Sequence, residues 1–526
     1  MTTLASHQSE VRTGRDGFGR LVHAEWTKLR TVRGWVVALL LIPVLTGLGA
    51  LLLTNVSCSL VGVDGQPVAC VAPATGPGGE AVADSFYLAR QALAGDGTIT
   101  ARVTSLAGRH TPVSTSPTPV TGGFEPGVQP WSKAGIMISA GTAQGSAYAA
   151  MMVTGGNGVR MQWNYTGDSA GLPGTVSASS PRWLRLTRSG DTLTGYDSSD
   201  GTHWNTVGSV VLSSLPSSAQ IGLFATSPSY IVLAPTFGGG QSQATGTFDR
   251  IALTWPGATG RWIGTGIGSD PAGPNGPDPF TGSFTHANDT ITVTGSGDIA
   301  PEVPETWDGV GVKAQDALTG TVVGLIPATI VAALFVTAEY RRGLIRLTFA
   351  AAPRRGRVLA AKAVAVGSAT FVAGLVGAAI ALASGIRLLS AGSPVLPMST
   401  FTEVRMVVGT AALLAVAAVL ALALGTLARR GVTAVTAVIA VIFVPLLLAT
   451  LPGLLPLGTQ EWLLRVTPGA AFAVIQSLPA YHQVLGQYQP AFGYFPLSAA
   501  AGFAVLCAWT AAALAAAGYA LRRRDV

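Results

Sequence analysis

Charged residues are scarce in this sequence, and six long apolar segments contain none. Only 11% of the 526 residues are Asp, Glu, Lys or Arg. A helix needs roughly 20 apolar residues to cross about 30 Å of hydrocarbon, so the composition predicts a polytopic α-helical membrane protein. Ion-coupled carriers usually keep an ionisable residue at mid-membrane, and its absence here argues against a secondary transporter. The six predicted helices cover residues 34–54, 318–338, 363–386, 406–428, 431–451 and 497–521.

Lysine is especially rare, and its positions exclude an ATP-binding loop. A P-loop needs Gly-Lys-Ser/Thr, because backbone N–H groups and the lysine hold the phosphates. None of the four lysines follows Gly or precedes Ser or Thr. Any ATP hydrolysis must therefore occur on another polypeptide, and we predict that this chain is not an enzyme and needs no cofactor. The four are Lys28, Lys133, Lys313 and Lys362.

The basic residues that are present indicate how the helices are oriented. Six spans place residues 1–33, 339–362, 429–430 and 522–526 on one side of the membrane, with 18 Arg and Lys between them. The short loops on the other side hold three. The positive-inside rule makes the basic side cytoplasmic, with both termini inside and the insert 55–317 outside a plasma membrane. The net charge of +7 is thus explained by basic residues on the cytoplasmic side of the membrane, and we expect no nucleic-acid partner.

Two features near the first and second spans need separate interpretation. Segment 34–54 follows a long N-terminal stretch and no A-x-A cleavage pattern follows it, so we interpret it as an uncleaved anchor. Segment 339–362 holds seven Arg and Lys, more than an anchor needs. These charges either set topology and contact anionic lipid headgroups, or form a docking surface for a cytoplasmic partner.

The insert is rich in turn formers and in alternating patterns. In GVRMQWNY, Val159, Met161, Trp163 and Tyr165 recur with a period of two, which is typical of a β-strand. Gly190-Asp191 and Asp200-Gly201 are typical turn formers between further short strands. We predict an all-β sandwich over 84–255. The Gly- and Pro-rich residues 256–317 then either pack on this sandwich or form a stalk.

Cysteine and histidine are too few and too scattered for a metal site. Of three cysteines, Cys58 and Cys70 lie in the insert, 12 residues apart. In an oxidising compartment they are expected to form a disulfide, and two free thiols are the alternative. Cys507 lies in the sixth span and is expected to be inert packing. The histidines lack metal-ligand spacing, so no metal is predicted.

Three basic stretches resemble the membrane subunit of a type-2 ABC exporter. They are HAEWTKLRTVRGW (23–35), AEYRRGLIRLTFAAAPRRGRVLAAK (338–362) and GYALRRRDV (518–526). The resemblance covers about 1–54 and 318–526. It implies a separate ATP-binding subunit, and a second permease copy or paralogue. Such permeases usually have only a small loop where this chain has its large insert.

The resemblance also implies particular elements. These are an interfacial helix within 1–33, a coupling element in 339–362, and short re-entrant helices in 463–485. Phe18, Val22, Trp26 and Leu29 fall at helical spacing, as an interfacial helix requires. For Glu339, an ordinary ion pair at a helix end is the alternative to a coupling role. The residues expected to couple to the ATPase are Glu25, Lys28, Arg30, Glu339, Arg341, Arg342, Arg346, Arg354 and Arg355.

Part of the insert, about 84–235, resembles a bacterial concanavalin A-like (LamG-like jelly-roll) domain. The phrases that carry the resemblance include WSKAGIMIS and RWLRLTRSGDTLTGYDSSDGTHW. Such domains often bind carbohydrate. Aromatic side chains at alternating positions either offer a sugar-stacking face or pack in the core. The E-x-D-x-x-E pattern of glucanases that share this fold is absent. We therefore do not expect this domain to hydrolyse glycosidic bonds. The candidate stacking residues are Trp131, Trp163, Tyr165, Trp183, Tyr196 and Trp204.

Two hypotheses follow from the sequence. The first is an ABC transporter permease subunit that forms part of a translocation path in the lipid bilayer, with a carbohydrate- or envelope-binding domain outside. The second is a membrane-anchored glycan-binding or sensor protein without transport activity. An associated ATP-binding subunit favours the first hypothesis. The transported substrate, its direction and the ligand of the sandwich do not follow from the sequence.

Overall fold

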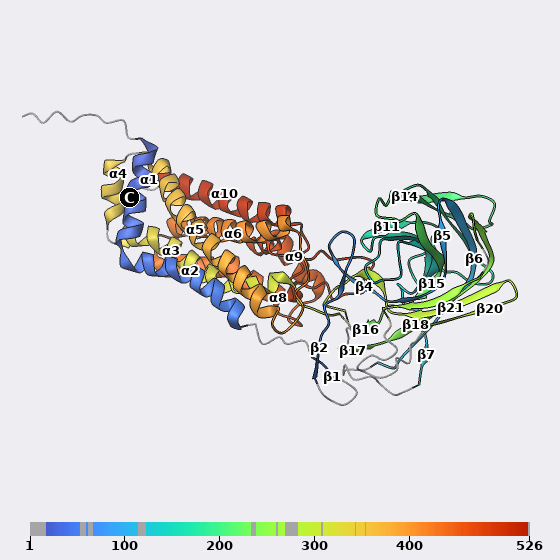
Figure 1. Ribbon diagram of the computed structural model, residues 1–526. Helices are drawn as coiled ribbons and strands as arrows, with labels where there is room; N and C mark the ends of the chain where they lie inside the picture. Colours follow the sequence, from blue (N-terminus) through green and yellow to red (C-terminus); the bar gives the residue numbers. More distant parts are fainter. Residues whose placement is uncertain are drawn as a thin grey trace, which may run out of the picture.

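The computed structural model has two parts joined end to end, a bundle of long helices and a β domain (Figure 1). Among the described residues, five helices are long and apolar enough to span a membrane, and a bent helix pair makes a sixth. The predicted fold class, a polytopic α-helical protein with an inserted all-β domain, is therefore confirmed. The structure describes residues 17–52, 59–61, 67–113, 123–232, 238–258, 261–268, 282–306, 309–341, 343–352 and 354–523.

The helices of the bundle largely coincide with the apolar segments of the sequence. A π-helical stretch, Ile439–Phe443, joins α7 to α8, and short 3₁₀ helices flank the bundle. These are η1 (Ala314–Leu318), η3 (Pro468–Val474) and η4 (Pro490–Phe492). The α-helices are α1 (Phe18–Thr31), α2 (Arg33–Leu52), α3 (Thr321–Arg341), α4 (Leu344–Ala351), α5 (Arg355–Leu389), α6 (Thr400–Ala428), α7 (Gly431–Val438), α8 (Val444–Thr450), α9 (Leu457–Val466) and α10 (Ala499–Arg523).

Most of segment 339–362 is helical instead of forming an open loop. The end of α3, all of α4 and the first turns of α5 lie within it. Helix α5 thus begins eight residues before the predicted span at 363. This extension places Lys362 on a rigid helix facing the bundle interior, where it is 2% exposed.

Helices α2 and α3 approach each other closely because small residues face each other. A Cβ atom on Gly320 would lie 2.3 Å from the Thr46 carbonyl oxygen, and one on Gly324 would lie 2.2 Å from the Thr46 hydroxyl. Small residues permit such close backbone contact between helices in a membrane. At the other end of α2, an 84° bend separates it from α1, so α1 runs across the bundle instead of along it.

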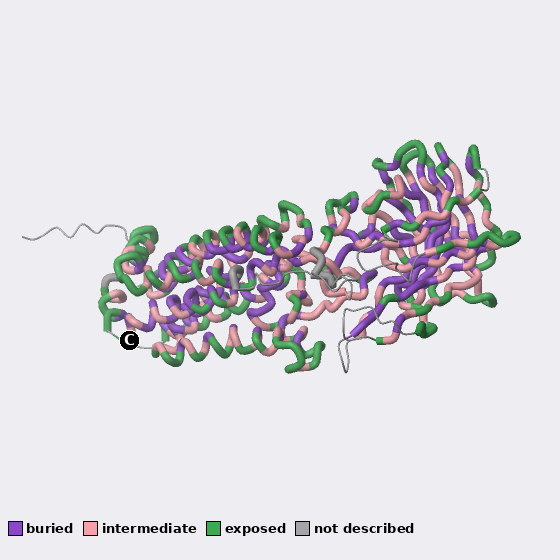
Figure 2. Tube along the Cα trace, turned by 60° about the horizontal axis from the view of Figure 1, so that its bottom comes forward, coloured by how far each residue is buried: buried purple, intermediate pink, exposed green. Residues whose placement is uncertain are grey.

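The β domain is a sandwich of two antiparallel sheets. Buried residues from both sheets, including Ile136 and Leu184, form its core, and buried residues run through both parts of the molecule (Figure 2). One sheet has the order β11-β10-β9-β8-β15-β5-β19, and the other has the order β14-β13-β12-β6-β18-β21-β20, with β7 paired to β6. Because β19 to β21 belong to these sheets, part of the segment 256–317 extends the sandwich.

The first sheet comprises β5 (Phe86–Ala94), β8 (Lys133–Ser139), β9 (Tyr148–Thr154), β10 (Val159–Trp163), β11 (Gly167–Ala170), β15 (Ser218–Thr226) and β19 (Ile263–Ile267). The second comprises β6 (Gly97–His110), β7 (Glu125–Pro126), β12 (Arg182–Ser189), β13 (Thr192–Ser198), β14 (Asn205–Val211), β18 (Ser242–Thr254), β20 (Ser283–Ala287) and β21 (Thr290–Ser296). The smaller sheets comprise β1 (Ser59–Val61) with β2 (Pro67–Ala69), β16 (Tyr230–Val232) with β17 (Gly238–Gly240), and β3 (Ala74–Thr75) with β4 (Ala81–Asp84) and β22 (Ile299–Pro301).

The central strands of the first sheet are buried on both faces. Every residue of β8 and β9 is buried, and a second apolar cluster lies on the face opposite the sandwich core. This cluster includes Val82 of β4 and Ile299 of β22, so the small three-stranded sheet covers that face. Continuous apolar runs such as AYAAMMV follow from burial on two sides, since only one-sided strands need alternate.

The β domain also contacts the bundle through a segment distant in sequence. The side chain of Gln483 donates to the Tyr165 carbonyl oxygen at 3.1 Å, and His482 Nε2 lies 2.8 Å from Asp168 Oδ2. Val484 packs against Ala300 and Val303. The segment between η3 and α10 is therefore a docking site for the β domain, which is held by more than its two chain connections.

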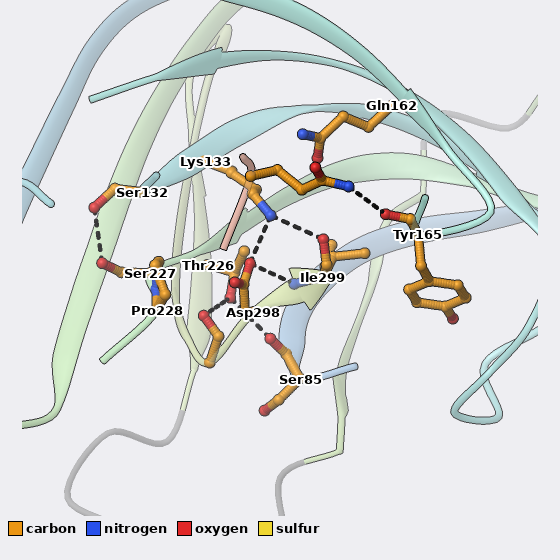
Figure 3. Close-up of polar contacts among 12 residues, drawn as sticks. Ser85, Ser132, Lys133, Gln162, Tyr165, Thr226, Ser227, Pro228, Asp298 and Ile299 are labelled. Carbon is orange, nitrogen blue, oxygen red and sulfur yellow. Dashed lines mark hydrogen bonds and ion pairs between the residues drawn. The ribbon is translucent and has the colours of Figure 1, made fainter. Parts of the chain in front are cut away.

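A buried lysine ties the sandwich to the strand that leads to the bundle. Lys133 Nζ donates to Asp298 Oδ1 at 2.5 Å and to the Ile299 carbonyl oxygen at 2.8 Å (Figure 3). The Lys133 side chain is 0% exposed and that of Asp298 is 11% exposed. A charge this deeply buried requires its partner, because desolvation is otherwise uncompensated.

We predict that Lys133→Met destabilises the β domain by about 3–5 kcal/mol, because it removes the ammonium group that compensates the largely buried Asp298 carboxylate. The free energy of unfolding of the domain is measured in the purified full-length chain by pulse proteolysis in urea. The double variant Lys133→Met with Asp298→Asn is the control and should recover most of the loss. Equal stability of the wild type and the single variant would contradict this role.

Candidate functional site

Four charged side chains from three separate helices meet at the end of the bundle away from the β domain. Lys362 Nζ on α5 donates to Glu25 Oε2 on α1 at 2.8 Å and to Glu339 Oε1 on α3 at 2.6 Å. Lys28 Nζ, also on α1, donates to Glu25 Oε1 at 2.8 Å and to Glu339 Oε1 at 3.1 Å. We call these four residues the charge cluster.

The charge cluster is balanced and almost completely buried. Glu25, Glu339 and Lys362 are 4%, 7% and 2% exposed, whereas the Lys28 side chain is 42% exposed. Two carboxylates and two ammonium groups carry no net charge. Among the described residues, Glu339 Oε2 is buried without a hydrogen-bond partner. The cluster is thus closed on its inner side by Lys362 and open to solvent only through Lys28.

The local sequence explains how α1 contributes to the cluster. Glu25, Lys28 and Leu29 are three and four residues apart, so they share one face of the helix. Leu29 is 2% exposed and packs in the bundle core. Trp26 and Phe18 are 39% and 41% exposed on the helix, where they are available for lipid contact. Helix α1 is therefore amphipathic, with a polar contact beneath it as well as an apolar one.

Removing either partner from a buried ion pair costs about 3–5 kcal/mol, because the remaining charge has lost its solvation. The Lys362 ammonium group bridges carboxylates on two different helices, so its position depends on both. Displacement of α1 alone would separate Glu25 from Lys362. The cluster consequently makes α1, α3 and α5 move together at this end of the bundle.

The nine residues expected to couple to an ATPase divide into groups. Glu25, Lys28 and Glu339 enter the cluster. Arg355 is half-buried and donates to the Leu521 carbonyl oxygen at 2.6 Å, which joins α5 to the end of α10. Arg342 lies outside the described residues. The remaining four are exposed, namely Arg30, Arg341, Arg346 and Arg354.

Arg346 lies on the short helix α4, Arg341 and Arg354 lie on either side of it in sequence, and Arg30 lies near the end of α1. In Figure 1, α4 and α1 both lie at the bundle end opposite the β domain. Leu344 and Leu347 of α4 are 43% and 69% exposed. This end of the molecule therefore presents exposed leucine side chains together with exposed arginine side chains, close to the charge cluster. We call the surface formed by Arg30, α4, Arg341 and Arg354 the basic end.

Lys362 is the cluster residue that the sequence reasoning missed. It was counted only among the basic residues at a helix end, where a lysine ordinarily extends toward lipid headgroups. Its partner Glu25 lies 337 residues away in sequence. The one available signal was its position directly before an uncharged run, together with two acidic residues in otherwise basic segments.

The six candidate stacking residues do not share one face of the β domain, and the alternative of internal packing holds for Trp131, Tyr165 and Trp163. Trp131 and Tyr165 are 5% and 1% exposed, because the small three-stranded sheet and the docking segment cover their side of the first sheet. His482 approaches the Trp131 ring edge-on at 6.0 Å. Trp163 packs on the sandwich core, where a Cβ atom on Gly167 would collide with its indole ring.

The other three aromatic residues share the outer face of the second sheet. Tyr196 on β13 is directly opposite Arg185 on β12, and the Arg185 guanidinium lies 3.7 Å from the centre of the Trp204 ring. Trp183 lies two positions before Arg185 on the same strand and is 5.7 Å from the Arg102 guanidinium. All three are half-buried. The aromatic surface that remains is smaller than predicted and is interleaved with arginine.

The structure describes one of the two cysteines of the predicted disulfide. Cys70 is disulfide-bonded, and Cys58 lies outside the described residues. The neighbouring strands β1 and β2 pair with Ser59 opposite Ala69. The Cys58–Cys70 pairing stays a prediction, which a shift in electrophoretic mobility on reduction would test.

The family model described as ABC-2 family transporter protein matches residues 168–526. This range covers more than half of the chain, and it includes the charge cluster residues Glu339 and Lys362. The chain belongs to the ABC-2 transporter family. The predicted resemblance to a type-2 ABC membrane subunit is confirmed, and this ABC-2 protein is a multi-pass membrane component of a transporter. The match begins inside the β domain, so it also includes part of the insert.

Several solved structures resemble part of this ABC-2 protein. Scytalido-glutamic peptidase shares 10% identity, covering 40% of this chain and 98% of the peptidase, with a TM-score of 0.26. The Lotus tetragonolobus seed lectin shares 10% identity, covering 41% and 93% of the two chains, with a TM-score of 0.17. Lectin I-B4 from Griffonia simplicifolia covers 40% and 86% at 11% identity and a TM-score of 0.14. These TM-scores are too low for the similarities to indicate a ligand. No curated protein matches the chain.

We predict that Lys362→Met destabilises the bundle by about 3–5 kcal/mol and releases α1, because only the partly exposed Lys28 then remains to compensate the buried Glu25 and Glu339 carboxylates. The measurements are thermal unfolding in detergent and limited proteolysis at the bend between α1 and α2.

Lys28→Met is the matched control. Its side chain is 42% exposed, so its loss should cost about 1 kcal/mol or less. The double variant Lys362→Met with Glu339→Gln removes one charge of each sign, leaves the Lys28–Glu25 pair in place, and should be more stable than Lys362→Met. Equal effects of the two lysine variants would contradict the bridging role of Lys362.

Proposed function

We propose that this ABC-2 protein is a permease subunit whose transport is powered by a separate ATP-binding subunit docked on the basic end. The observation that carries the proposal is the charge cluster, which links α1, α3 and α5 directly beneath that exposed surface. The chain lacks Gly-Lys-Ser/Thr, so the energy source must be a partner. A second copy or a paralogue would complete the translocation path.

The mechanism follows from the rigidity of the buried ion pairs. An ATPase that closes on nucleotide moves the surface it contacts, here α4 and the first turns of α5. Because Lys362 lies on α5 and its two carboxylate partners lie on α1 and α3, the displacement reaches three helices at once. Helix α3 then carries it across the membrane, since a helix transmits an axial or tilting motion along its length.

The proposed orientation places the basic end in the cytoplasm and the β domain outside the plasma membrane. The support is the distribution of Arg and Lys, which gather at the end of the bundle opposite the β domain. In this orientation the β domain meets the cell envelope. The half-buried Trp183, Tyr196 and Trp204 with Arg185 are the part of the predicted stacking set that could contact a glycan.

A sensor without transport activity remains the competing function. It would need no ATPase, so the basic end would contact only lipid headgroups. Co-purification of the full-length chain from mild detergent separates the two. An ATP-binding subunit that remains bound and hydrolyses ATP supports the permease, whereas a chain that consistently lacks one supports the sensor.

We predict that the triple variant Arg341→Ala, Arg346→Ala, Arg354→Ala weakens association with the ATP-binding subunit at least tenfold and abolishes coupled transport. All three side chains are exposed, so membrane insertion and the thermal midpoint should be unchanged. Association is measured by pull-down at physiological salt. Arg250→Ala, an exposed arginine of the β domain, is the control. Wild-type association of the triple variant would refute docking at this surface.

The orientation is tested by labelling in intact cells. A cysteine placed at Thr202 in the exposed turn after β13, in a chain with Cys507→Ala, should react with an impermeant maleimide. A cysteine placed at Arg346 in α4 should react only after the membrane is permeabilised. The opposite pattern would reverse the proposed topology, and labelling of both sites in intact cells would reject the six-span arrangement.

A further inference from the structure

A cavity of about 380 Å³ lies where the β domain joins the helix bundle. Its walls come from four regions distant in sequence: the stretch from Glu305 to the start of α3, the end of α8, η3, and the segment around η4. In Figure 1, α8 and α9 mark this end of the bundle, next to the β domain. The volume falls within the range of about 300–1,000 Å³ that small-molecule sites occupy. It is separate from the charge cluster, which lies at the opposite end of the bundle.

The lining is apolar on one side and charged on the other. The apolar residues belong mainly to segments long and greasy enough to span the membrane, with Val322 on α3 and Leu446 and Leu447 on α8. Phe472 and Ile475 extend this wall. The polar residues come from the stretch nearest the β domain and are Glu305, Lys313, Gln315 and Asp316. An occupant that matches both halves must itself be amphipathic.

Most of the polar groups already have partners inside the protein. Lys313 Nζ donates to Glu305 and to the Phe492 carbonyl oxygen at 2.7 Å. Gln315 accepts from the Ser477 backbone N–H at 2.6 Å and donates to the Gly493 carbonyl oxygen at 3.1 Å. These side chains therefore hold the walls of the cavity together and have little capacity left for a ligand.

Asp316 is different. Among the described residues, its carboxylate accepts one side-chain hydrogen bond, from the Lys313 backbone N–H at 3.2 Å. Glu305 and Lys313 neutralise each other, so Asp316 leaves the lining with one net negative charge. A carboxylate with free acceptor capacity in a largely apolar wall favours a cationic hydrogen-bond donor, because charge-assisted hydrogen bonds are the strong ones.

We propose that this cavity binds an amphiphile with a protonated amine head, which Asp316 holds while the hydrocarbon tail lies against α8 and η3. The amine is supplied either by the headgroup of a membrane lipid on the β-domain side or by a free alkylamine. Binding at this site requires neither nucleotide nor the ATP-binding subunit, so it stands or falls independently of the coupling proposed above.

The test uses the full-length chain in phosphatidylcholine nanodiscs without ATP. The probe is a C16 alkylamine that carries a photoreactive diazirine, and the C16 alcohol and carboxylic acid with the same diazirine are its comparisons. After irradiation, labelled peptides are located by mass spectrometry. We expect the amine to label peptides that contain α8 and η4 at least tenfold more than the alcohol or the acid.

Two variants and one control sharpen the result. Asp316→Asn keeps the shape of the side chain and should lower labelling by the amine about tenfold, without changing labelling by the alcohol. Val322→Trp should fill the cavity and block labelling by all three probes. Val323→Trp alters the neighbouring residue, which is 42% exposed and outside the lining, and should leave labelling unchanged.

The remaining arms distinguish the source of the amine and the failure of the proposal. Competition by phosphatidylethanolamine in the nanodisc points to a lipid headgroup, whereas competition only by soluble alkylamine points to a free amphiphile. Labelling that neither Asp316→Asn nor Val322→Trp reduces would overturn the site. Absence of labelling by the amine in the wild-type chain would overturn it as well. If the chain is then dimeric and Val322→Trp dissociates the dimer, a second copy of the chain fills the cavity instead.

Discussion

The arrangement of the bundle depends on how a lysine is accommodated away from water. Lys362 is 2% exposed and lies directly before the uncharged, apolar segment of α5. An unpaired ammonium group would be strongly unfavourable there. Its two carboxylate partners must therefore be present, and they come from α1 and α3. This requirement holds α1 across the bundle end, below the bend that separates it from α2. It also accounts for the positions of Glu25 and Glu339 in segments rich in Arg and Lys.

The same helices connect this charge cluster to the junction with the β domain. Helix α3 carries Glu339 near one end and Val322 at the other, a separation of about 25 Å at the rise of an α-helix. Helix α5 carries Lys362 near its start, and the residues after its end pair with the stretch before η1, through Val395 and Val312. Changes in the cluster and in the amphipathic cavity are therefore joined by continuous helices, without an intervening flexible loop.

The β domain is stabilised differently, because the central strands of one of its sheets are buried on both faces. The cover comes from β3, β4 and β22 and from the docking segment that contains His482 and Gln483. This cover removes Trp131 and Tyr165 from any ligand-binding surface, although their alternating positions made them reasonable candidates. What is left on the outer face of the second sheet is a small group of aromatic and arginine side chains. A sandwich architecture alone does not assign it a ligand.

Local patterns in the sequence determined the membrane helices, the strands and the basic segments. Hydrocarbon thickness sets the length of an apolar run, and the pleat of a strand sets its period, so both can be recognised within a short window. The helical spacing of Phe18, Val22, Trp26 and Leu29 was visible in the same way. The family resemblance also rested on short basic stretches. These features depend on neighbours in the chain, which is why the sequence alone sufficed.

Only the tertiary structure decided which charges are buried together and which aromatic residues are covered. Lys362 and Glu25 are 337 residues apart, and Gln483 and Tyr165 are 318 residues apart. Nothing in a local window distinguishes a lysine that reaches lipid headgroups from one that bridges two carboxylates. Likewise, a period of two cannot tell a solvent-facing strand from one that a later segment covers. Desolvation depends on every atom nearby, and these atoms are brought together only when the chain folds.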